Sequence, residues 1–232
     1  MTVKGIDISH WQDPTPSLAG LSFVCVKATQ GLTTDPSWAK HGAAVRKAGL
    51  VLIAYAFGVD SLPARDQARY FLDVVGASTK VVALDVEGPN APSQDQITEW
   101  MRVCKAAGKT TLLYHSASGF PHGIGQDANW IAQWGTDAPE GSWAIWQYRG
   151  APLDLDVWHG TEASLQAFAG TAPKPKPKPP AHLFVHVKHG DTLGGIAKAH
   201  HITTARLLKF PENARYRHNP NLIHIGDRVR VR

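Results

Sequence analysis

Short apolar runs recur through the first 170 residues and alternate with stretches of helical periodicity. The runs predict strands at 3–9, 23–29, 50–58, 80–87, 110–116, 129–134 and 143–148. The early runs are almost continuously apolar, as expected for strands with both faces buried. The stretches between them predict helices at 36–48, 63–75 and 93–107. Asp35 is the expected N-cap of the first helix, because Pro36 follows it.

This alternation of strands and helices predicts the fold class. Strand–helix repeats of this length are typical of an α/β fold with a parallel, barrel-shaped sheet. The loops between the later strands are too short to hold helices. We therefore expect an irregular TIM-like (β/α) barrel whose last third lacks helices.

A Lys/Pro segment divides the chain. Residues 171–181 contain alternating Lys and Pro, a composition that favours an extended, solvated spacer over a packed core. The domain boundaries expected from this are 1–170 for a catalytic barrel, 171–181 for the linker and 182–232 for a small second domain. Apolar patterning in the last part predicts a βααβ module.

Charge is distributed unevenly between these parts. The net charge is +5, but residues 1–170 carry −4 and residues 171–232 carry +9. A basic module suits a polyanionic partner such as nucleic acid, anionic lipid or an acidic wall polymer. Charge alone does not choose among these partners.

Several functional classes find no support in the sequence. Cys25 and Cys104 lie in apolar surroundings and are interpreted as core residues. The histidines near the C-terminus fit no zinc-ligand spacing, and there is no phosphate-binding glycine motif, so we expect neither metal nor cofactor. No apolar run is long enough to cross a bilayer, so no membrane insertion is expected. The N-terminus has no secretory signal pattern.

The segment ALDVEG, residues 83–88, carries the clearest chemical pattern. Asp85 and Glu87 are two apart on a predicted strand, so both side chains point to the same face. They end the strand, and that end is the catalytic face of a parallel barrel. Two carboxyls there suit glycoside hydrolysis, in which one donates a proton and another stabilises positive charge. An acidic pair at this place can also simply cap the next helix.

Further acidic and aromatic residues are expected at the same face. Asp7 ends the first predicted strand, and Asp154 and Asp156 follow the last one in LDLDVW. Crowded carboxyls raise one another's pKa, which keeps a general acid protonated near neutral pH. Aromatic rings near the strand ends, such as Tyr55 and Trp134, could stack on sugar faces.

These stretches together resemble the glycoside hydrolase family 25 muramidases, the Chalaropsis-type lysozymes. The similarity runs through GIDISHWQ, FVCVKATQG, LIAYAFG, ALDVEG, LLYHS, NWIAQW, IWQY and LDLDVWHG. It implies cleavage of the β-1,4 bond between N-acetylmuramic acid and N-acetylglucosamine. It also implies that Glu87 is the general acid/base and that Asp85 stabilises an intermediate formed by the substrate's acetamido group.

The resemblance also assigns supporting positions. Asp7 and Asp154 match family aspartates, and Asp154 fits better than Asp156 because the family pattern is Asp-x-Asn. Four further residues match substrate-lining positions: Tyr55, Tyr114, Trp134 and Gln147. Two positions depart from the family, with Gln30 in place of Glu and Ala56 in place of His. These departures bear on substrate contacts and local charge rather than on the reaction.

The C-terminal module resembles a LysM domain, a module that binds glycans containing N-acetylglucosamine. The resemblance places its groove on two loops, Gly190, Asp191 and Thr192 in one and Asn221, Leu222 and Ile223 in the other. Asp191 is also the expected N-cap of the module's first helix.

The sequence as a whole predicts a monomeric peptidoglycan hydrolase whose partner is the glycan strand. Without a signal peptide, we expect a phage endolysin made in the host cytoplasm and released to the wall through a holin. There are two alternatives. One is a non-catalytic wall-binding protein on a retired muramidase fold, and the intact Asp85–Glu87 pair argues against it. The other is a nucleic-acid-binding protein that uses the basic module. It ranks last because the sequence has no recognised nucleic-acid fold, so we expect no nucleic-acid partner.

Overall fold

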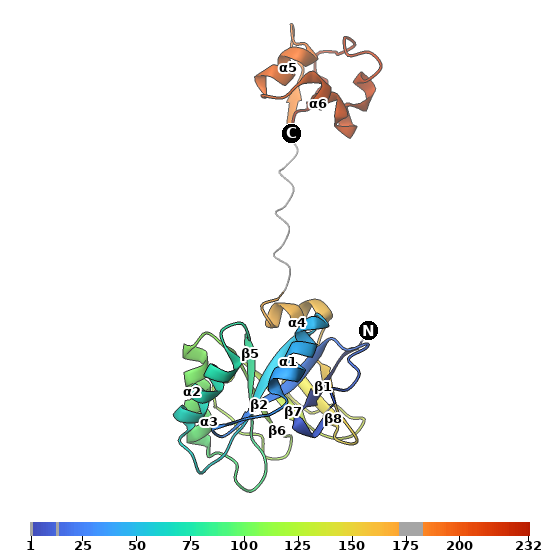
Figure 1. The fold of residues 1–232 in the computed structure, drawn as a ribbon. Helices are drawn as coiled ribbons and strands as arrows, with labels where there is room; N and C mark the ends of the chain where they lie inside the picture. The colour runs from blue at the N-terminus through green and yellow to red at the C-terminus, as the bar shows by residue number, and fades with distance from the viewer. Residues whose placement is uncertain (1, 13, 172–182) are drawn as a thin grey trace. The chain divides into compact units, whose positions relative to one another are not determined.

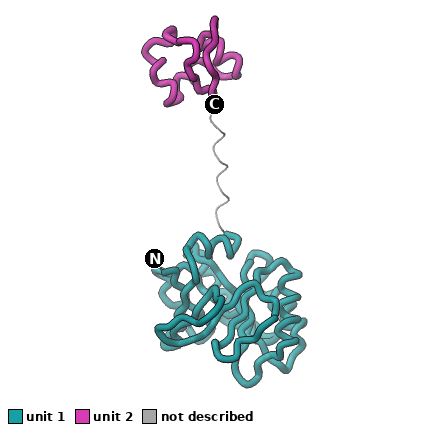
Figure 2. Tube along the Cα trace, turned by 180° about the vertical axis from the view of Figure 1, so that it is seen from behind, with its two compact units in different colours: residues 1–172 teal, residues 173–232 magenta. Residues whose placement is uncertain are grey.

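The computed structural model describes residues 2–12, 14–171 and 183–232. The chain divides into two compact units, Met1–Ala172 and Pro173–Arg232 (Figure 2). The predicted linker, 171–181, lies outside the described residues except for its first position.

The described part of unit 1 is built on a closed, eight-stranded barrel (Figure 1). Around the barrel the strands are β1 (Val3–Ile8), β9 (Asp154–Trp158), β8 (Ile145–Arg149), β7 (Ala128–Ala132), β6 (Thr110–Ser116), β5 (Val81–Asp85), β4 (Val51–Phe57) and β2 (Phe23–Gln30). Pairing between β1 and β2 closes the ring, and the short β3 (Thr33–Thr34) adds to β2. The predicted α/β, TIM-like fold class is confirmed.

Alternation along the strands sorts the apolar residues into two cores. Cys25, Ile53 and Ala83 belong to a core inside the barrel. Their sequence neighbours, such as Val24 and Val82, pack outward against the helices. Both faces of these strands are therefore buried, which explains why their sequence runs are continuously apolar.

Three helices cover the outside of the barrel: α1 (Trp38–Lys47), α2 (Ala64–Val75) and α3 (Gln94–Ala106). α2 and α3 pack side by side (Figure 1). The predicted cap of α1 was wrong, because Ser37 is the N-cap residue. Asp35 instead accepts hydrogen bonds from the Ser37 backbone N–H at 2.9 Å and hydroxyl at 2.7 Å. The helix therefore begins two residues after the predicted start.

The last strand corrects a second prediction. LDLDVW was placed after the final strand, but it forms β9, which runs antiparallel to both β8 and β1. Its start therefore lies beside the end of β1, where Asp154 pairs with Asp7. A short helix, α4 (Glu162–Phe168), follows and was also not predicted.

Unit 2 has its own small core. β10 (Phe184–His186) pairs antiparallel with β11 (Arg228–Arg230), and between them lie α5 (Leu193–Ala199), α6 (Thr204–Lys209) and the 3₁₀ helix η2 (Pro211–Tyr216). The N-cap of α5 is Thr192, whose hydroxyl accepts from the Gly195 N–H at 3.0 Å. The expected cap Asp191 instead closes the preceding turn by accepting from the Lys188 N–H at 2.7 Å.

No helix among the described residues is both long and apolar enough to cross a membrane.

Candidate active site

The carboxyls singled out in the sequence meet at one end of the barrel. Parallel strands bring Asp7 and Asp85 to this end, and the reversed β9 brings Asp154. They line a pocket of about 340 Å³ together with Glu87. The pocket also contains the four predicted substrate-lining residues, Tyr55, Tyr114, Trp134 and Gln147. The structure therefore brings together the whole predicted catalytic set, and Asp156 lies buried next to it.

Asp85 and Glu87 occupy different environments. β5 ends at Asp85, so Glu87 lies just beyond the strand rather than in it. Asp85 is buried, and its Oδ1 has no hydrogen-bond partner among the described residues. Glu87 stands at the exposed mouth of the pocket. The inner carboxyl is thus shielded from solvent, and the outer one is accessible to a substrate.

Burial and crowding raise the pKa values of these acids. Burial, and next the charge of Glu87, raise the pKa of Asp85 well above its usual range, and Lys27 partly offsets this. Glu87 is exposed as a residue, but partial burial of its carboxyl still raises its pKa against the opposing charges of Lys27 and His115. Burial and Glu87 raise the pKa of Asp154 to about 6. A carboxyl that stays protonated near neutral pH is what a general acid requires.

A hydrogen-bonded network centres on Gln147. Its Nε2 donates to Asp7 Oδ2 at 2.8 Å, while its Oε1 accepts from the Tyr114 hydroxyl and from Trp134 Nε1, each at 3.1 Å. Gln147 is buried, and these bonds fix the orientation of its amide. Predicted to line the substrate, it serves here to hold three other pocket residues in place.

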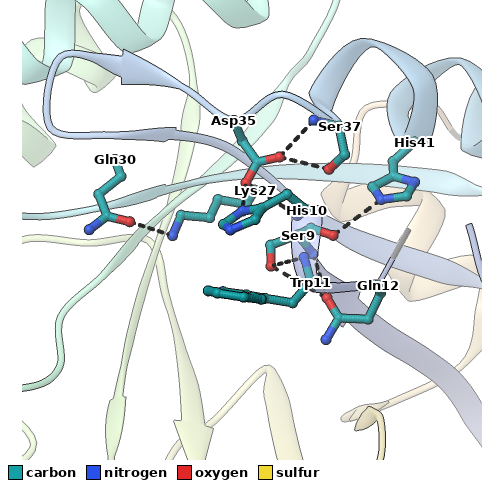
Figure 3. Close-up of polar contacts among 9 residues, drawn as sticks. All are labelled: Ser9, His10, Trp11, Gln12, Lys27, Gln30, Asp35, Ser37 and His41. Atoms are coloured by element: carbon teal, nitrogen blue, oxygen red, sulfur yellow. Dashed lines mark hydrogen bonds and ion pairs between the residues drawn. The ribbon is translucent and has the colours of Figure 1, made fainter. Parts of the chain in front are cut away.

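Lys27 is a pocket residue that was not predicted from the sequence. Its Nζ donates to Gln30 Oε1 at 2.8 Å (Figure 3). The same Nζ lies 4.7 Å from the centroid of the Phe57 ring. Burial lowers the pKa of Lys27, and the charges of Asp85, Asp35 and Glu87 oppose that shift. A lysine within the apolar run FVCVKAT was the available signal, because an ammonium in a buried strand needs acidic or polar partners.

Trp11 forms part of the pocket wall while remaining 80% exposed. It belongs to the 3₁₀ helix η1 (His10–Gln12), which Asp35 anchors by accepting from His10 Nδ1 at 2.8 Å (Figure 3). Burial alone would raise the pKa of Asp35, but hydrogen bonds from Ser37 and His10 lower it. An ionised, buried Asp35 therefore fixes the segment that carries Trp11.

The second exposed indole, Trp134, rests on a glycine. A Cβ atom added at Gly150 would lie 2.2 Å from the Trp134 ring. Only a glycine therefore allows the ring to lie flat there with its Nε1 bonded to Gln147. Trp134 is 69% exposed, so its indole is available as a surface on which a sugar can stack.

A larger hollow of about 750 Å³ lies elsewhere, along the loops after β6 and β7. Glu140 is the one carboxyl among the residues that line this hollow. The larger of the two cavities is therefore not the one that holds the cluster of acids. Among the described residues, no group of three or more His, Cys, Asp or Glu side chains is arranged to hold a metal ion.

The two predicted groove loops of unit 2 lie at one end of its two-stranded sheet. The Val187 N–H donates to Asp227 O and the Gly226 N–H donates to Val187 O, each at 2.8 Å, so the end of β10 lies beside the turn before β11. The loop with Gly190, Asp191 and Thr192 follows β10, and the loop with Asn221, Leu222 and Ile223 precedes that turn. Leu222 is 58% exposed, which leaves an apolar side chain available to a ligand.

Comparisons with known proteins agree with this architecture. The chain is 28% identical over 209 residues to lysozyme M1 from Streptomyces globisporus, covering 72% of this chain and 71% of that protein. It is 29% identical over 199 residues to the uncharacterized protein YegX of Escherichia coli K12, covering 72% and 73%. A solved bacterial lysozyme from Streptomyces coelicolor superposes with a TM-score of 0.64 at 27% identity, covering 74% of this chain and 99% of that one.

Family models match both units. The LysM domain model matches residues 185–232. The model of glycosyl hydrolases family 25 matches residues 6–154, which is well over half of the chain. The protein therefore belongs to glycosyl hydrolases family 25 and carries a LysM domain after its catalytic barrel.

Proposed function

We propose that this protein is an N-acetylmuramidase that cleaves the β-1,4 bond between N-acetylmuramic acid and N-acetylglucosamine in peptidoglycan. The observation that carries the proposal is the pairing of a buried Asp85 with an accessible Glu87 in one pocket flanked by exposed indoles. Family membership supports the same reaction class.

Glu87 is the proposed general acid. Its raised pKa keeps a proton available for the leaving glycosidic oxygen, and its place at the pocket mouth puts that proton within reach of a bound strand. After bond cleavage the same carboxylate would take a proton from the attacking water.

Asp85 is the proposed stabiliser of the intermediate formed by the substrate's acetamido group. The positive charge that develops on this group favours the ionised form of Asp85. The attraction is therefore stronger in the transition state than in the ground state, which is the condition for catalysis. Asp7 and Asp154, at the same pocket, would complete the acidic wall that receives this charge.

The LysM domain is the proposed anchor on the wall. Tethering keeps the catalytic barrel at a high local concentration on an insoluble polymer. The proposed contacts are the two loops around Asp191 and Leu222, and the proposed partner is the glycan strand, bound by a monomer.

Digestion of purified peptidoglycan, followed by mass spectrometry of the soluble products, tests the reaction. We expect new reducing ends on N-acetylmuramic acid, and a loss of at least ~100-fold in rate for Glu87→Gln, because this change removes the transferable proton but keeps the side chain's shape. Reducing ends on N-acetylglucosamine would keep the glycosidase and overturn the bond assignment.

The alternative, a wall-binding protein without activity, rests on the departures at Gln30 and Ala56. It predicts that wild type and Glu87→Gln bind walls equally and that neither releases sugar ends. The retained carboxyl pair and its raised pKa values favour the enzyme.

We further propose a biological role as a phage endolysin that acts on the wall from a host cytoplasm once a holin opens the membrane. A wall anchor joined to a muramidase suits an enzyme that must act on intact walls. Expression in a bacterial host with and without a holin tests this role. Lysis only in the presence of the holin supports it, and secretion of active enzyme from cells without a holin contradicts it.

A further inference from the structure

Asp156 is a buried acid that the proposed mechanism does not use. It lies on β9 opposite Gly5 of β1 and Gln147 of β8, and it has no solvent exposure. Its Oδ1 accepts from Trp130 Nε1 at 2.9 Å. Its Oδ2 is buried with no donor among the described residues. An ionised carboxylate oxygen that is buried and unpaired is unfavourable, because the charge has lost its hydration without gaining a donor.

The neighbour that can resolve this is Asp7. Asp156 pairs with Gly5, two positions before Asp7 on β1, so the side chains of Asp7 and Asp156 are diagonal neighbours on one face of the two strands. Asp156 also pairs with Gln147, whose Nε2 donates to Asp7 Oδ2 at 2.8 Å. This arrangement brings the two carboxyls close enough to shift each other's pKa. Two ionised carboxylates can only accept hydrogen bonds, so their negative charges repel each other when the groups are close. A single proton converts the contact into a short O–H···O⁻ hydrogen bond.

We propose that Asp156 is a positioning residue that shares a proton with Asp7 and thereby holds Asp7 against Gln147. Its effect on catalysis rests on the proposed function, whereas the shared proton itself does not.

The surrounding groups favour retention of this proton. Asp154 on β9 adds a negative charge. Cys25 on β2, Tyr55 on β4 and Tyr114 on β6 face the pair, and burial raises the pKa of each, so they stay neutral. None of these neighbours supplies a positive charge. Burial raises the pKa of Asp7 well above its usual range and that of Asp156 to about 7.

Loss of the proton would disturb more than the pair. Two adjacent buried charges would push Asp7 away from Asp156 and strain its bond to Gln147. Gln147 also holds Tyr114 and Trp134, so the disturbance would spread to the stacking wall of the pocket. An uncharged donor at position 156 would keep this arrangement without any proton to lose.

The direct test is a pH titration of the full-length protein with ¹³C-labelled aspartate carboxyl carbons, read by NMR. We expect one carboxyl of the Asp7–Asp156 pair to remain protonated at neutral pH, assigned by its disappearance in Asp156→Asn. If both carboxyls ionise near the ordinary Asp value of about 4, the proposal fails. This measurement needs neither activity nor a destabilised variant.

Matched variants test the positioning role. Asp156→Asn can accept from Trp130 and donate to Asp7, so we expect its kcat/KM at pH 6 to stay within about threefold of wild type. Asp156→Leu has a similar volume but no donor, and we expect a loss of about tenfold or more. Equal activity of the two variants would overturn the role, since shape alone would then suffice. The exposed Asp73→Asn on α2 is the control for a change of net charge.

The pH dependence of thermal unfolding tests the shared proton independently. A folded-state pKa raised above the unfolded one means that stability is lost as pH rises from about 4 towards the folded pKa. The Tm of Asp156→Asn relative to wild type should therefore increase between pH 5 and 8. A constant difference would contradict the shared proton.

Discussion

Lys27 places a positive charge beside both Asp85 and Glu87, and a neutral residue holds it there. Its Nζ donates to the Gln30 amide oxygen at 2.8 Å. An amide orients the ammonium without neutralising it, so the charge continues to act on the two carboxyls. The identity of residue 30 therefore sets part of the electrostatic field of the pocket.

Gln30→Glu should shift the pH profile upwards. A carboxylate beside Lys27 cancels its charge, and the pKa of Glu87 then rises, because the charge of Lys27, more than that of His115, lowers it. The general acid stays protonated to higher pH, so the alkaline limb of kcat/KM should move up by roughly one unit. Gln30→Met is the uncharged control, in which the added carboxylate is absent. An unmoved limb in Gln30→Glu would show that Lys27 does not govern Glu87.

Gly150→Ala should weaken substrate binding through Trp134. The new methyl group overlaps the indole and forces it off Gln147. We expect KM for soluble muropeptides to rise several-fold with a smaller change in kcat. The double variant Gly150→Ala/Trp134→Ala shows whether Gly150 acts through the indole ring or in another way. If Gly150 acts through the ring, adding Gly150→Ala to Trp134→Ala has no further effect.

Single site residues could be predicted from the sequence where a chemically reactive residue directly follows an apolar run. Asp7 and Asp85 follow apolar runs, so their position at a strand end could be read directly. Lys27 and the bonding role of Gln147 depend on which strands become neighbours. Gln147 reaches Asp7 across 140 positions of sequence, and no local pattern carries that information.

Among the elements, the parallel strands were predictable and the closing strand was not. β2 and β4 are buried on both faces and so have continuous apolar sequences. β9 alternates Asp with apolar residues, and this pattern resembles a polar loop when its partners are unknown. Asp154 lines the pocket and Asp156 is buried beside it, so the polar positions of this strand face inward where the other strands place apolar residues.

Helix α3 offers a stability test at this scale. Ser93 and Gln96 form a reciprocal capping box, and Gln96 Nε2 also donates to Asp60 O at 2.9 Å. Ser93→Ala should lower the free energy of unfolding by ~1 kcal/mol, measured by urea denaturation, with activity at low temperature unchanged. Ser93→Asp keeps an acceptor and should retain most of the stability. A loss as large in Ser93→Asp would exclude capping as the cause.

The molecule as a whole joins an acidic catalytic unit to a basic binding unit, each with its own core. Residues 1–172 alone should hydrolyse soluble muropeptides at the full-length rate. On intact sacculi at dilute enzyme they should act at least ~10-fold more slowly, because the tether is missing. Equal rates on sacculi would show that unit 2 does not anchor the enzyme.

Salt distinguishes the possible partners of the basic unit. Binding of the full chain to sacculi through glycan contacts should change little as salt is raised. Binding through phosphate groups would instead weaken steeply, with a slope set by the number of ion contacts. Cosedimentation with sacculi stripped of anionic polymers, across a salt series, gives both readings.

The placement of β1 between β2 and β9 has a consequence for biosynthesis. β1 leaves the ribosome about 150 residues before β9, and it gains its second partner only when residues 154–158 have followed. Until then Asp7 has neither Gln147 nor Asp156 beside it, so the acidic wall is incomplete in every shorter nascent chain. Non-local pairing of this kind also slows folding. A wall-degrading enzyme built in this way acquires its activity only once its barrel has been synthesised in full.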